Sequence, residues 1–170
     1  MSVVKRPQRQ NHIVKGQEMK TTTKTQINAP ASTVFLWLDD NDRLKQWVPN
    51  LTVDEVIVDT PEKIGTRFRQ VFQENGRKME MMGEITAYVE NKHMRVYMSG
   101  KMFNLDVEYI LTAVSEAQTD VTQNTQIQFK GFLKILAPLM FLMSKISSKD
   151  PQADAHAKLK AMAEAEYQAG

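Results

Sequence analysis

The pattern of apolar and polar positions in the middle of the chain predicts a series of consecutive strands. Between Thr66 and Phe129, apolar and polar side chains alternate in runs that are separated by short turn signals. Alternation with a period of two is typical of a strand that buries one face. The turn signals are Asn75-Gly76, Asn91-Lys92, Gly100 and the polar segment 115–119. Because these connections are short, we expect strands that follow one another in the chain to pair as an antiparallel meander.

The segment before this meander predicts two more strands and two short helices. Residues 19–27 are rich in Thr and Lys and are expected to form an exposed strand. Short helices are predicted at 32–39 and 42–47, because a proline precedes the first helix and Pro49 ends the second. A strand rich in Val and Ile is expected at 51–59.

After Gly131 the spacing of the apolar residues becomes helical. One apolar stripe contains Phe132, Leu136, Leu139, Met143 and Ile146, and a second contains Ala155, Leu159 and Met162. At about 100° per residue, the two stripes point in different directions. Asp150-Pro151 lies between them and is typical of an N-cap and a first helical residue. We therefore predict a kink or break within about two residues of Lys149.

Short sequence motifs occur in the order and spacing of a known superfamily. They are Ile27-Asn28-Ala29-Pro30-Ala31, Val34-Phe35, Leu38-Asp39, Trp47-Val48-Pro49, Gly65-Thr66-Arg67-Phe68, Tyr109-Ile110-Leu111 and the segment 133–142. Over residues 19–165 the chain resembles the polyketide cyclase/dehydrase-like branch of the START/Bet v 1-like (SRPBCC) superfamily. The resemblance implies an α+β helix-grip fold. In that fold a curved antiparallel sheet of about seven strands carries two short helices and holds a long C-terminal helix over its concave face.

The same resemblance implies a cavity between the sheet and the closing helix. Families of this type bind lipids, sterols, polyketides or other apolar molecules, and a minority are enzymes. The superfamily carries no universal catalytic residue, so no catalytic residue is transferred to this chain. Fold alone does not separate binding from catalysis.

Composition narrows the chemistry further. The chain has 170 residues and no cysteine, which fits one domain and excludes disulfides, thiol catalysis and cysteine-ligated metals. The histidines His12, His93 and His156 have no metal-ligand spacing, so no metal is expected. The sequence contains neither a glycine-rich phosphate loop nor a Gly-x-Ser-x-Gly motif, and no cofactor is predicted.

The positive charge is concentrated at the N-terminus. Residues 1–20 sum to +4, so the remaining chain sums to −2. We interpret residues 1–16 as a flexible basic tail and residues 17–170 as one domain. A basic tail beside an acidic domain argues against nucleic-acid binding and leaves weak contact with an anionic membrane surface as an alternative. Because no signal peptide or membrane-spanning segment is recognised, we expect a cytoplasmic protein.

The alternation also predicts which side chains face the concave side. Inward amides and a phenol among apolar residues are typical of a cavity that holds water or a ligand, although the glutamines could instead pair with each other. The acids Asp106 and Glu108 fall on the opposite face, where pairing with arginines is expected. The predicted pocket residues are Phe35, Phe68, Gln70, Met81, Met98, Leu105, Tyr109, Gln123, Thr125, Ile127, Leu139 and Met143.

Three functional hypotheses follow. The first, which the sequence favours, is a module that binds an apolar small molecule or lipid in the cavity. The second is a cyclase, aromatase or dehydratase-like enzyme that uses polar pocket groups, and an acid paired with a tyrosine would support it. The third is an interaction protein in which the apolar surface at Phe132–Met143 forms a homodimer or membrane contact.

Overall fold

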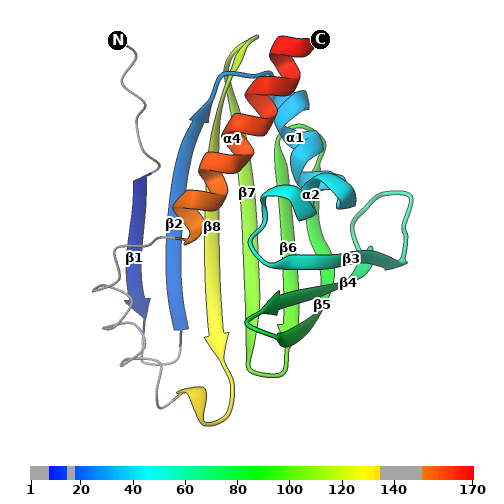
Figure 1. Cartoon of the computed structure of the whole chain (residues 1–170), viewed down its shortest axis with the longest axis vertical. Coiled ribbons are helices and arrows are strands. Elements are labelled where there is room, and N and C mark those ends of the chain that lie inside the picture. The colour runs from blue at the N-terminus through cyan, green and yellow to red at the C-terminus, as the bar shows by residue number, and fades with distance from the viewer. Residues whose placement is uncertain (1–7, 15–17, 135–150) are drawn as a thin grey trace.

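The computed structural model describes residues 8–14, 18–134 and 151–170. In these residues, eight strands form one antiparallel sheet in the spatial order β1-β2-β8-β7-β6-β5-β4-β3 (Figure 1). The strands are β1 (Gln8–Val14), β2 (Glu18–Ile27), β3 (Leu51–Val58), β4 (Arg67–Glu74), β5 (Arg77–Val89), β6 (His93–Gly100), β7 (Phe103–Ser115) and β8 (Gln118–Phe129). The helices are α1 (Ala31–Asp39), α2 (Asn41–Trp47) and α4 (Pro151–Ala169). The predicted helix-grip architecture is confirmed.

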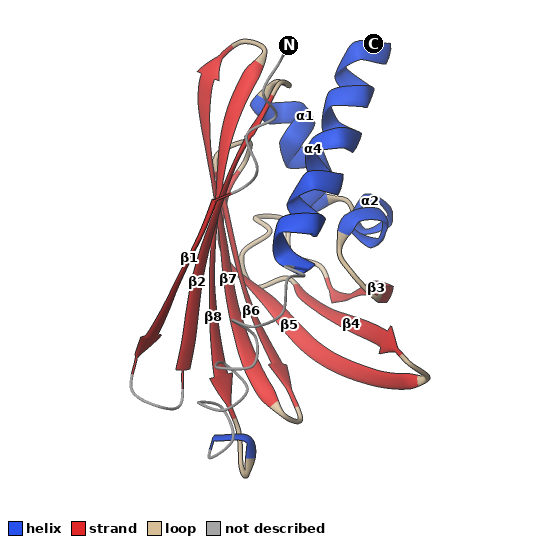
Figure 2. Ribbon diagram, turned by 60° about the vertical axis from the view of Figure 1, so that its left-hand side comes forward, coloured by secondary structure: helices blue, strands red, loops and turns tan. Residues whose placement is uncertain are grey.

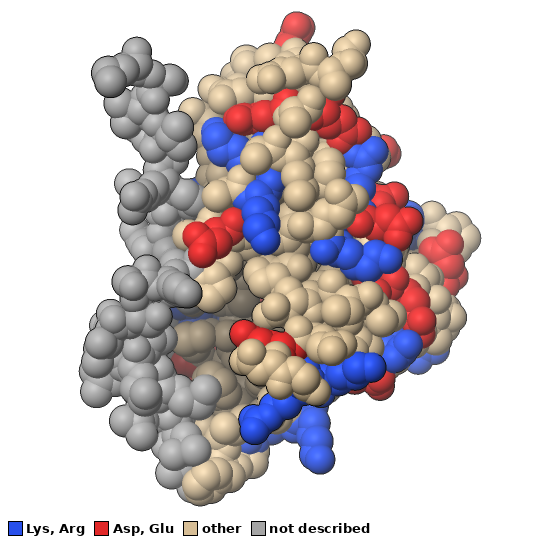
Figure 3. Space-filling view, in the orientation of Figure 1, with Lys and Arg blue, Asp and Glu red and all other residues tan. Residues whose placement is uncertain are grey.

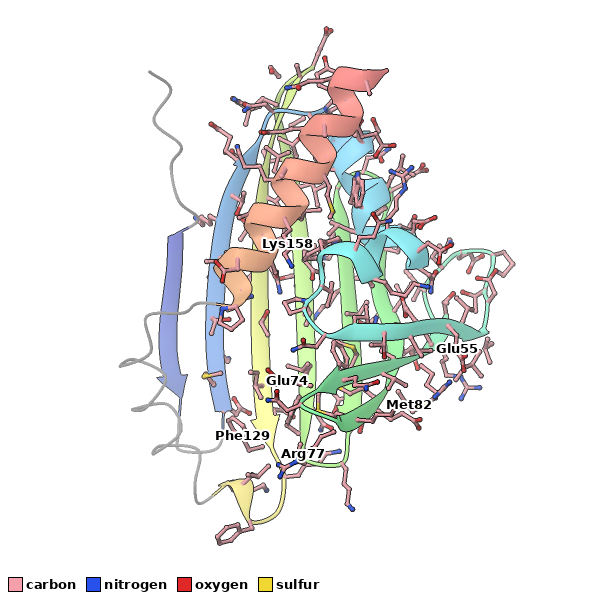
Figure 4. All side chains as sticks on the ribbon, viewed as in Figure 1. Glu55, Glu74, Arg77, Met82, Phe129 and Lys158 are labelled. Atoms are coloured by element: carbon pink, nitrogen blue, oxygen red, sulfur yellow. The ribbon has the colours of Figure 1, made fainter. Side chains whose placement is uncertain are left out.

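The strands β4 to β8 are those that the alternation predicts, and β2 and β3 are those that composition predicts. The turn between β4 and β5 is Asn75-Gly76, with φ values of 50° and 75°. Positive φ at both positions is what a two-residue hairpin turn requires, and Asn and Gly tolerate it. Glu74 and Arg77 flank this turn and lie opposite each other (Figure 4).

The strand β1 lies where the sequence predicts no element. It pairs with β2 from Gln8↔Lys24 to Val14↔Glu18. The prediction of an unstructured tail rests on low apolar content, which disfavours packing into a core. An edge strand needs only backbone hydrogen bonds to its neighbour, so composition is a poor guide here. The domain boundary at residue 17 stays a prediction.

The helices α1, α2 and α4 lie on one side of the sheet (Figure 2). The fully buried side chains Ile27, Val34, Val121 and Leu159 come from β2, α1, β8 and α4 and form the packed core where these elements meet. On α4, Ala155 and Ala163 are also buried. None of the helices in the described part of the chain is long and apolar enough to cross a bilayer.

Polar contacts fix α4 against α1 and the end of β2. Glu166 forms an ion pair with Arg43, and it accepts a hydrogen bond of 2.6 Å from the indole Nε1 of Trp37. Glu164 accepts a hydrogen bond of 2.7 Å from the backbone N–H of Asn28. The described part of α4 runs from Pro151 to Ala169, so the start predicted at Asp150-Pro151 stays a prediction. The predicted kink near Lys149 and the preceding apolar stripe, including Leu139 and Met143, lie outside the described residues.

The sheet bends at its β3 edge. The pairing of β3 with β4 shifts register twice, and the pairing of β5 with β6 shifts once. Such irregularities increase bending and twist. Gly83 pairs with Phe68 across β5 and β4, and a Cβ at Gly83 would lie 2.2 Å from carbons of the Phe68 ring. The Phe68 ring therefore occupies the space that a side chain at Gly83 would need.

Candidate functional site

A cavity of about 290 Å³ lies between the concave face of the sheet and the helices. Its apolar wall comes from α1, α2 and strands β3 to β7. This wall consists of Leu38, Leu44, Val48, Val56, Phe68, Phe72, Ile85, Met94, Val96, Met98, Leu105 and Val107. The space-filling view shows this face of the molecule hollowed beside β3, with acidic side chains at the border (Figure 3). The volume is at the lower end of the range of about 300–1,000 Å³ for small-molecule sites.

Most of the predicted pocket residues that the structure describes line this cavity. They are Phe68, Gln70, Met98, Leu105, Tyr109, Gln123 and Thr125. Phe35 and Met81 instead belong to the packed core, where the Phe35 ring contacts Tyr88 edge-on at 5.4 Å. Ile127 is half-buried and does not line the cavity. The sequence pattern places these three side chains toward the interior, but it does not show which neighbours fill the space.

The side of the cavity next to α4 is bordered by a row of polar side chains that bond to each other. His156 on α4 is fully buried, with its Nδ1 atom 2.8 Å from the Thr25 hydroxyl and its Nε2 atom bonded to the carbonyl of Gln123. Because an amide oxygen can only accept, the Nε2–H donates to Gln123, and Nδ1 bonds the Thr25 hydroxyl. The amide of Gln123 then donates to Thr125 at 3.1 Å.

The same row continues toward the start of α4. Gln152 donates to the Thr125 hydroxyl at 3.3 Å and accepts from the Thr21 hydroxyl at 3.1 Å. We call Thr21, Thr25, Gln123, Thr125, Gln152 and His156 the helix-side row. Its hydrogen bonds join β2, β8 and α4, so the row positions the helix on the sheet. Gln123 therefore both lines the cavity and has partners.

Carboxylates gather on the other side of the cavity. Asp39, Asp54 and Asp59 line it, together with a single lysine among the described residues, Lys63. They come from the end of α1, from β3 and from the loop after β3, which is the sheet edge opposite to β2. We call these three carboxylates the acidic end.

Asp54 is half-buried, as Asp39 is, whereas Asp59 is exposed. The Asp54 carboxylate accepts a hydrogen bond of 3.2 Å from the amide of Gln70, a buried residue of β4. Burial raises the pKa of Asp54, while the hydrogen bond from Gln70 and the charge of Lys45 partly oppose that rise. A carboxyl group with a raised pKa in a cavity is suited to proton transfer.

Asp39 lies between a tyrosine and a lysine. The hydroxyl of Tyr88 donates to Asp39 at 3.2 Å, and the ammonium of Lys63 is 4.0 Å from the same carboxylate oxygen. Desolvation, with the nearby Asp39 charge, raises the pKa of Tyr88 to about 12. This is the acid and tyrosine pair that the catalytic hypothesis requires, although Tyr88 itself is not part of the cavity lining.

Tyr109 differs from the other polar groups of the cavity. It is 8 % exposed, and its ring contacts the Trp47 ring edge-on at 6.4 Å. Its hydroxyl makes no hydrogen bond to any residue that the structure describes, although the residue borders the cavity. Burial raises the pKa of Tyr109, so the hydroxyl stays protonated and able to donate. The hydroxyl is not among the described side-chain atoms that are both shut off from solvent and without a partner, so it is open to the cavity, where water or a ligand can satisfy it.

The outer face of the sheet carries paired charges, as the alternation predicts. Arg95 binds Asp106 through two hydrogen bonds of 2.8 and 2.7 Å, and His93 lies 3.0 Å from Glu108. Glu55 and Met82 lie on strands at the right of the view, and Lys158 lies on α4 (Figure 4). No cluster of potential metal ligands occurs in residues 8–14, 18–134 and 151–170.

Sequence reasoning misses His156, Asp39 and Asp54. His156 is the one polar residue among the buried positions of α4, and its place on the apolar face is visible in the helical spacing. Asp39 is the last residue of a predicted short helix, where an acidic residue does not stand out in the sequence. Asp54 lies in a strand whose register shifts, so alternation does not predict which face of the sheet its side chain is on. Phe132 is 70 % exposed, and the rest of the predicted interaction surface at Phe132–Met143 lies mostly outside the described residues.

Known structures share this fold. A protein from Thermus thermophilus is 17 % identical and superimposes with a TM-score of 0.68 over 85 % of this chain and 97 % of its own. A START superfamily protein from Mycobacterium smegmatis, 13 % identical, gives 0.63 over 88 % and 97 %. The Zhui aromatase/cyclase from Streptomyces sp. R1128, 11 % identical, gives 0.63 over 83 % and 93 %. At these identities the likeness establishes the fold alone.

A comparison with curated proteins gives no match. The family model described as polyketide cyclase / dehydrase and lipid transport matches residues 18–164, which include every strand after β1, both short helices and most of α4. The match agrees with the resemblance in the sequence motifs. The chain therefore belongs to the polyketide cyclase / dehydrase and lipid transport family.

Proposed function

We propose that this protein binds an apolar small molecule or lipid in the cavity between the sheet and the helices. The observation that carries the proposal is the cavity of about 290 Å³, walled mostly by apolar side chains and bordered by the Tyr109 hydroxyl, which has no partner among the described residues. A packed core would fill this volume, because protein interiors rarely contain voids of such size. Flexible methionines, here Met94 and Met98, suit a wall that adapts to ligands.

A neutral fluorescent probe tests the proposal. N-phenylnaphthylamine should bind with enhanced fluorescence, and Met98→Trp should abolish binding while the fold survives, because the cavity absorbs the added volume. Ile110→Trp is the matched control, since Ile110 is 38 % exposed and does not line the cavity. Unfolding of Met98→Trp would mean that the interior resists overpacking and would contradict the proposal, as would probe binding that Met98→Trp leaves unchanged.

A second candidate function is acid–base catalysis on the bound molecule. The specific observation is Asp54, whose raised pKa suits a general base, in the same cavity as the protonated hydroxyl of Tyr109. Mass spectrometry of molecules that co-purify under native conditions would supply the compound to be assayed. Catalysis predicts its conversion on incubation and loss of conversion in Asp54→Asn with probe binding retained. Binding alone predicts that the compound is recovered unchanged.

The cytoplasmic location, a homodimer and weak contact with a membrane surface stay predictions. Native mass spectrometry of the whole chain tests the dimer directly.

A further inference from the structure

The polar groups of the cavity are distributed unevenly. Carboxylates come from the α1 end, β3 and the following loop, whereas the neutral hydroxyl and amides of Tyr109, Gln123 and Thr125 come from β7 and β8. Strands β4, β5 and β6 separate these two groups in the sheet, and they supply apolar residues to the wall between them. The cavity is therefore polarised across the sheet.

The charges at the acidic end are only partly balanced. Lys63 is 4.0 Å from Asp39, so its positive charge is directed to that carboxylate. Lys45, whose charge reaches Asp54, forms its ion pair with Asp42 at 2.8 Å. Within the described residues, neither Asp54 nor Asp59 has an ion-pair partner. The lining thus carries three carboxylates against one ammonium.

Charge of one sign in a partly enclosed apolar cavity discriminates between ligands. Charges interact more strongly where low-dielectric walls exclude water. A ligand carboxylate would be repelled mainly by the half-buried Asp54 and less by Asp59, which is exposed and screened by solvent, while an ammonium group would be attracted. A neutral hydroxyl or amide N–H can donate to these carboxylates without repulsion.

The Tyr109 hydroxyl is the second, independent sign of a ligand. The residue is more than nine-tenths buried, its hydroxyl is unpartnered among the described residues, and it borders the same cavity. A ligand oxygen or nitrogen that accepts from Tyr109 would satisfy it. The acidic end and Tyr109 lie on opposite sides of the apolar wall, so one elongated molecule can reach both.

On the basis of the proposed binding function, we propose that the cavity selects amphipathic ligands that place an ammonium or a neutral hydrogen-bond donor at Asp54 and Asp59 and a hydrogen-bond acceptor at Tyr109, and that it discriminates against carboxylates. The ligand class is therefore apolar amines and alcohols rather than fatty acids.

Displacement of N-phenylnaphthylamine at pH 7 by three ligands of equal chain length tests this proposal. Decylamine should bind about tenfold more tightly than decanoate, with decanol between them, and added salt should narrow the difference. Decanoate binding as tightly as decylamine would overturn the proposal. Absence of probe binding would instead refute the proposed function itself, so the two failures are distinguishable.

Two variants test whether the preference for decylamine over decanoate comes from Asp54. Asp54→Asn should bring decylamine and decanoate to within about threefold of each other, and it should change the affinity for decanol less than about twofold, because the amide oxygen still accepts from a hydroxyl. Glu62→Gln is the matched control, because Glu62 is an exposed carboxylate of the same loop as Asp59 and does not line the cavity. Equal effects of the two variants would overturn the assignment to Asp54. The comparison of the three ligands in the unmodified protein needs no variant, so the proposal can still be tested if a variant folds poorly.

The Tyr109 part has its own readout. An aminodecanol with its two groups at opposite ends should lose several-fold affinity in Tyr109→Phe, whereas decylamine should change less than about twofold. Equal changes for both ligands would overturn the role of the Tyr109 hydroxyl.

Discussion

The helix-side row and the acidic end border the same cavity but treat polar groups in opposite ways. In the helix-side row, His156, Gln123 and Thr125 bond to one another and to β2, so the row is a structural element that holds α4 in place. At the acidic end, Asp54 has an amide partner but no ion pair among the described residues, and Tyr109 across the cavity has no hydrogen-bond partner there. Partnered groups stabilise the fold, and unpartnered groups are available to a ligand.

The largest expected effect comes from breaking the helix-side row. His156→Ala removes a fully buried ring and leaves the Thr25 hydroxyl and the Gln123 carbonyl without this partner. We expect the free energy of unfolding to fall by about 3 kcal/mol, measured by urea denaturation. Lys158→Ala, an exposed position on the same helix, is the control. A loss below about 1 kcal/mol would mean that the row does not hold the helix.

Gly83→Ala should have the next largest effect. The new Cβ would lie 2.2 Å from the Phe68 ring, so the ring must move. Because the ring also lines the cavity, its movement changes the cavity wall. We expect a loss of about 1–3 kcal/mol in the free energy of unfolding together with weaker probe binding. Full stability with unchanged binding would show that the ring can relax elsewhere.

Asp54→Asn should have a smaller, pH-dependent effect. Because burial raises the pKa of Asp54 in the folded protein, the native state binds more protons than the unfolded state between the two pKa values. Asp54 therefore lowers stability as the pH rises above its ordinary value of 3.8. The difference in the free energy of unfolding between the variant and the parent should therefore favour the variant more at pH 7 than at pH 3. Denaturation at both pH values measures this, and a difference of the opposite sign would contradict it.

Tyr109→Phe should have the smallest effect on stability. The hydroxyl has no partner in the described residues, so its removal costs no internal hydrogen bond, and a change under about 0.5 kcal/mol is expected. The same denaturation series provides the measurement. A loss as large as that of His156→Ala would show that Tyr109 belongs with the structural groups.

The contrast between these regions also explains what the sequence could predict. Alternation and turn motifs predict the strands from β4 to β8, and composition predicts β2 and β3. The strand β1 is not predictable from apolar content, since it pairs only along a sheet edge. Alternation finds Gln123 and Tyr109, yet it cannot distinguish the partnered amide from the unpartnered phenol, because that depends on His156 more than 30 residues away.

The acidic end is missed for a different reason. The shifts of register in β3 break the link between sequence parity and side-chain direction, so Asp54 cannot be assigned to the cavity from its neighbours. Phe35 and Met81 are placed on the correct side but lie in the packed core, since their neighbours, Tyr88 among them, fill the space. Local sequence patterns predict which face of a strand or helix a side chain is on. Whether that side chain lines a cavity or packs into the core depends on elements that are distant in the chain.

The central claim is that the cavity holds an apolar ligand, and methyl NMR of methionine tests it most directly. Met94 and Met98 line the cavity, whereas Met82 is 43 % exposed on the other side of β5 and does not (Figure 4). On titration with decylamine, the account predicts saturable shifts of the Met94 and Met98 methyl signals with the Met82 signal unmoved. Shifts confined to Met82, or no shift of Met94 and Met98 at ligand concentrations that displace the probe, would contradict it.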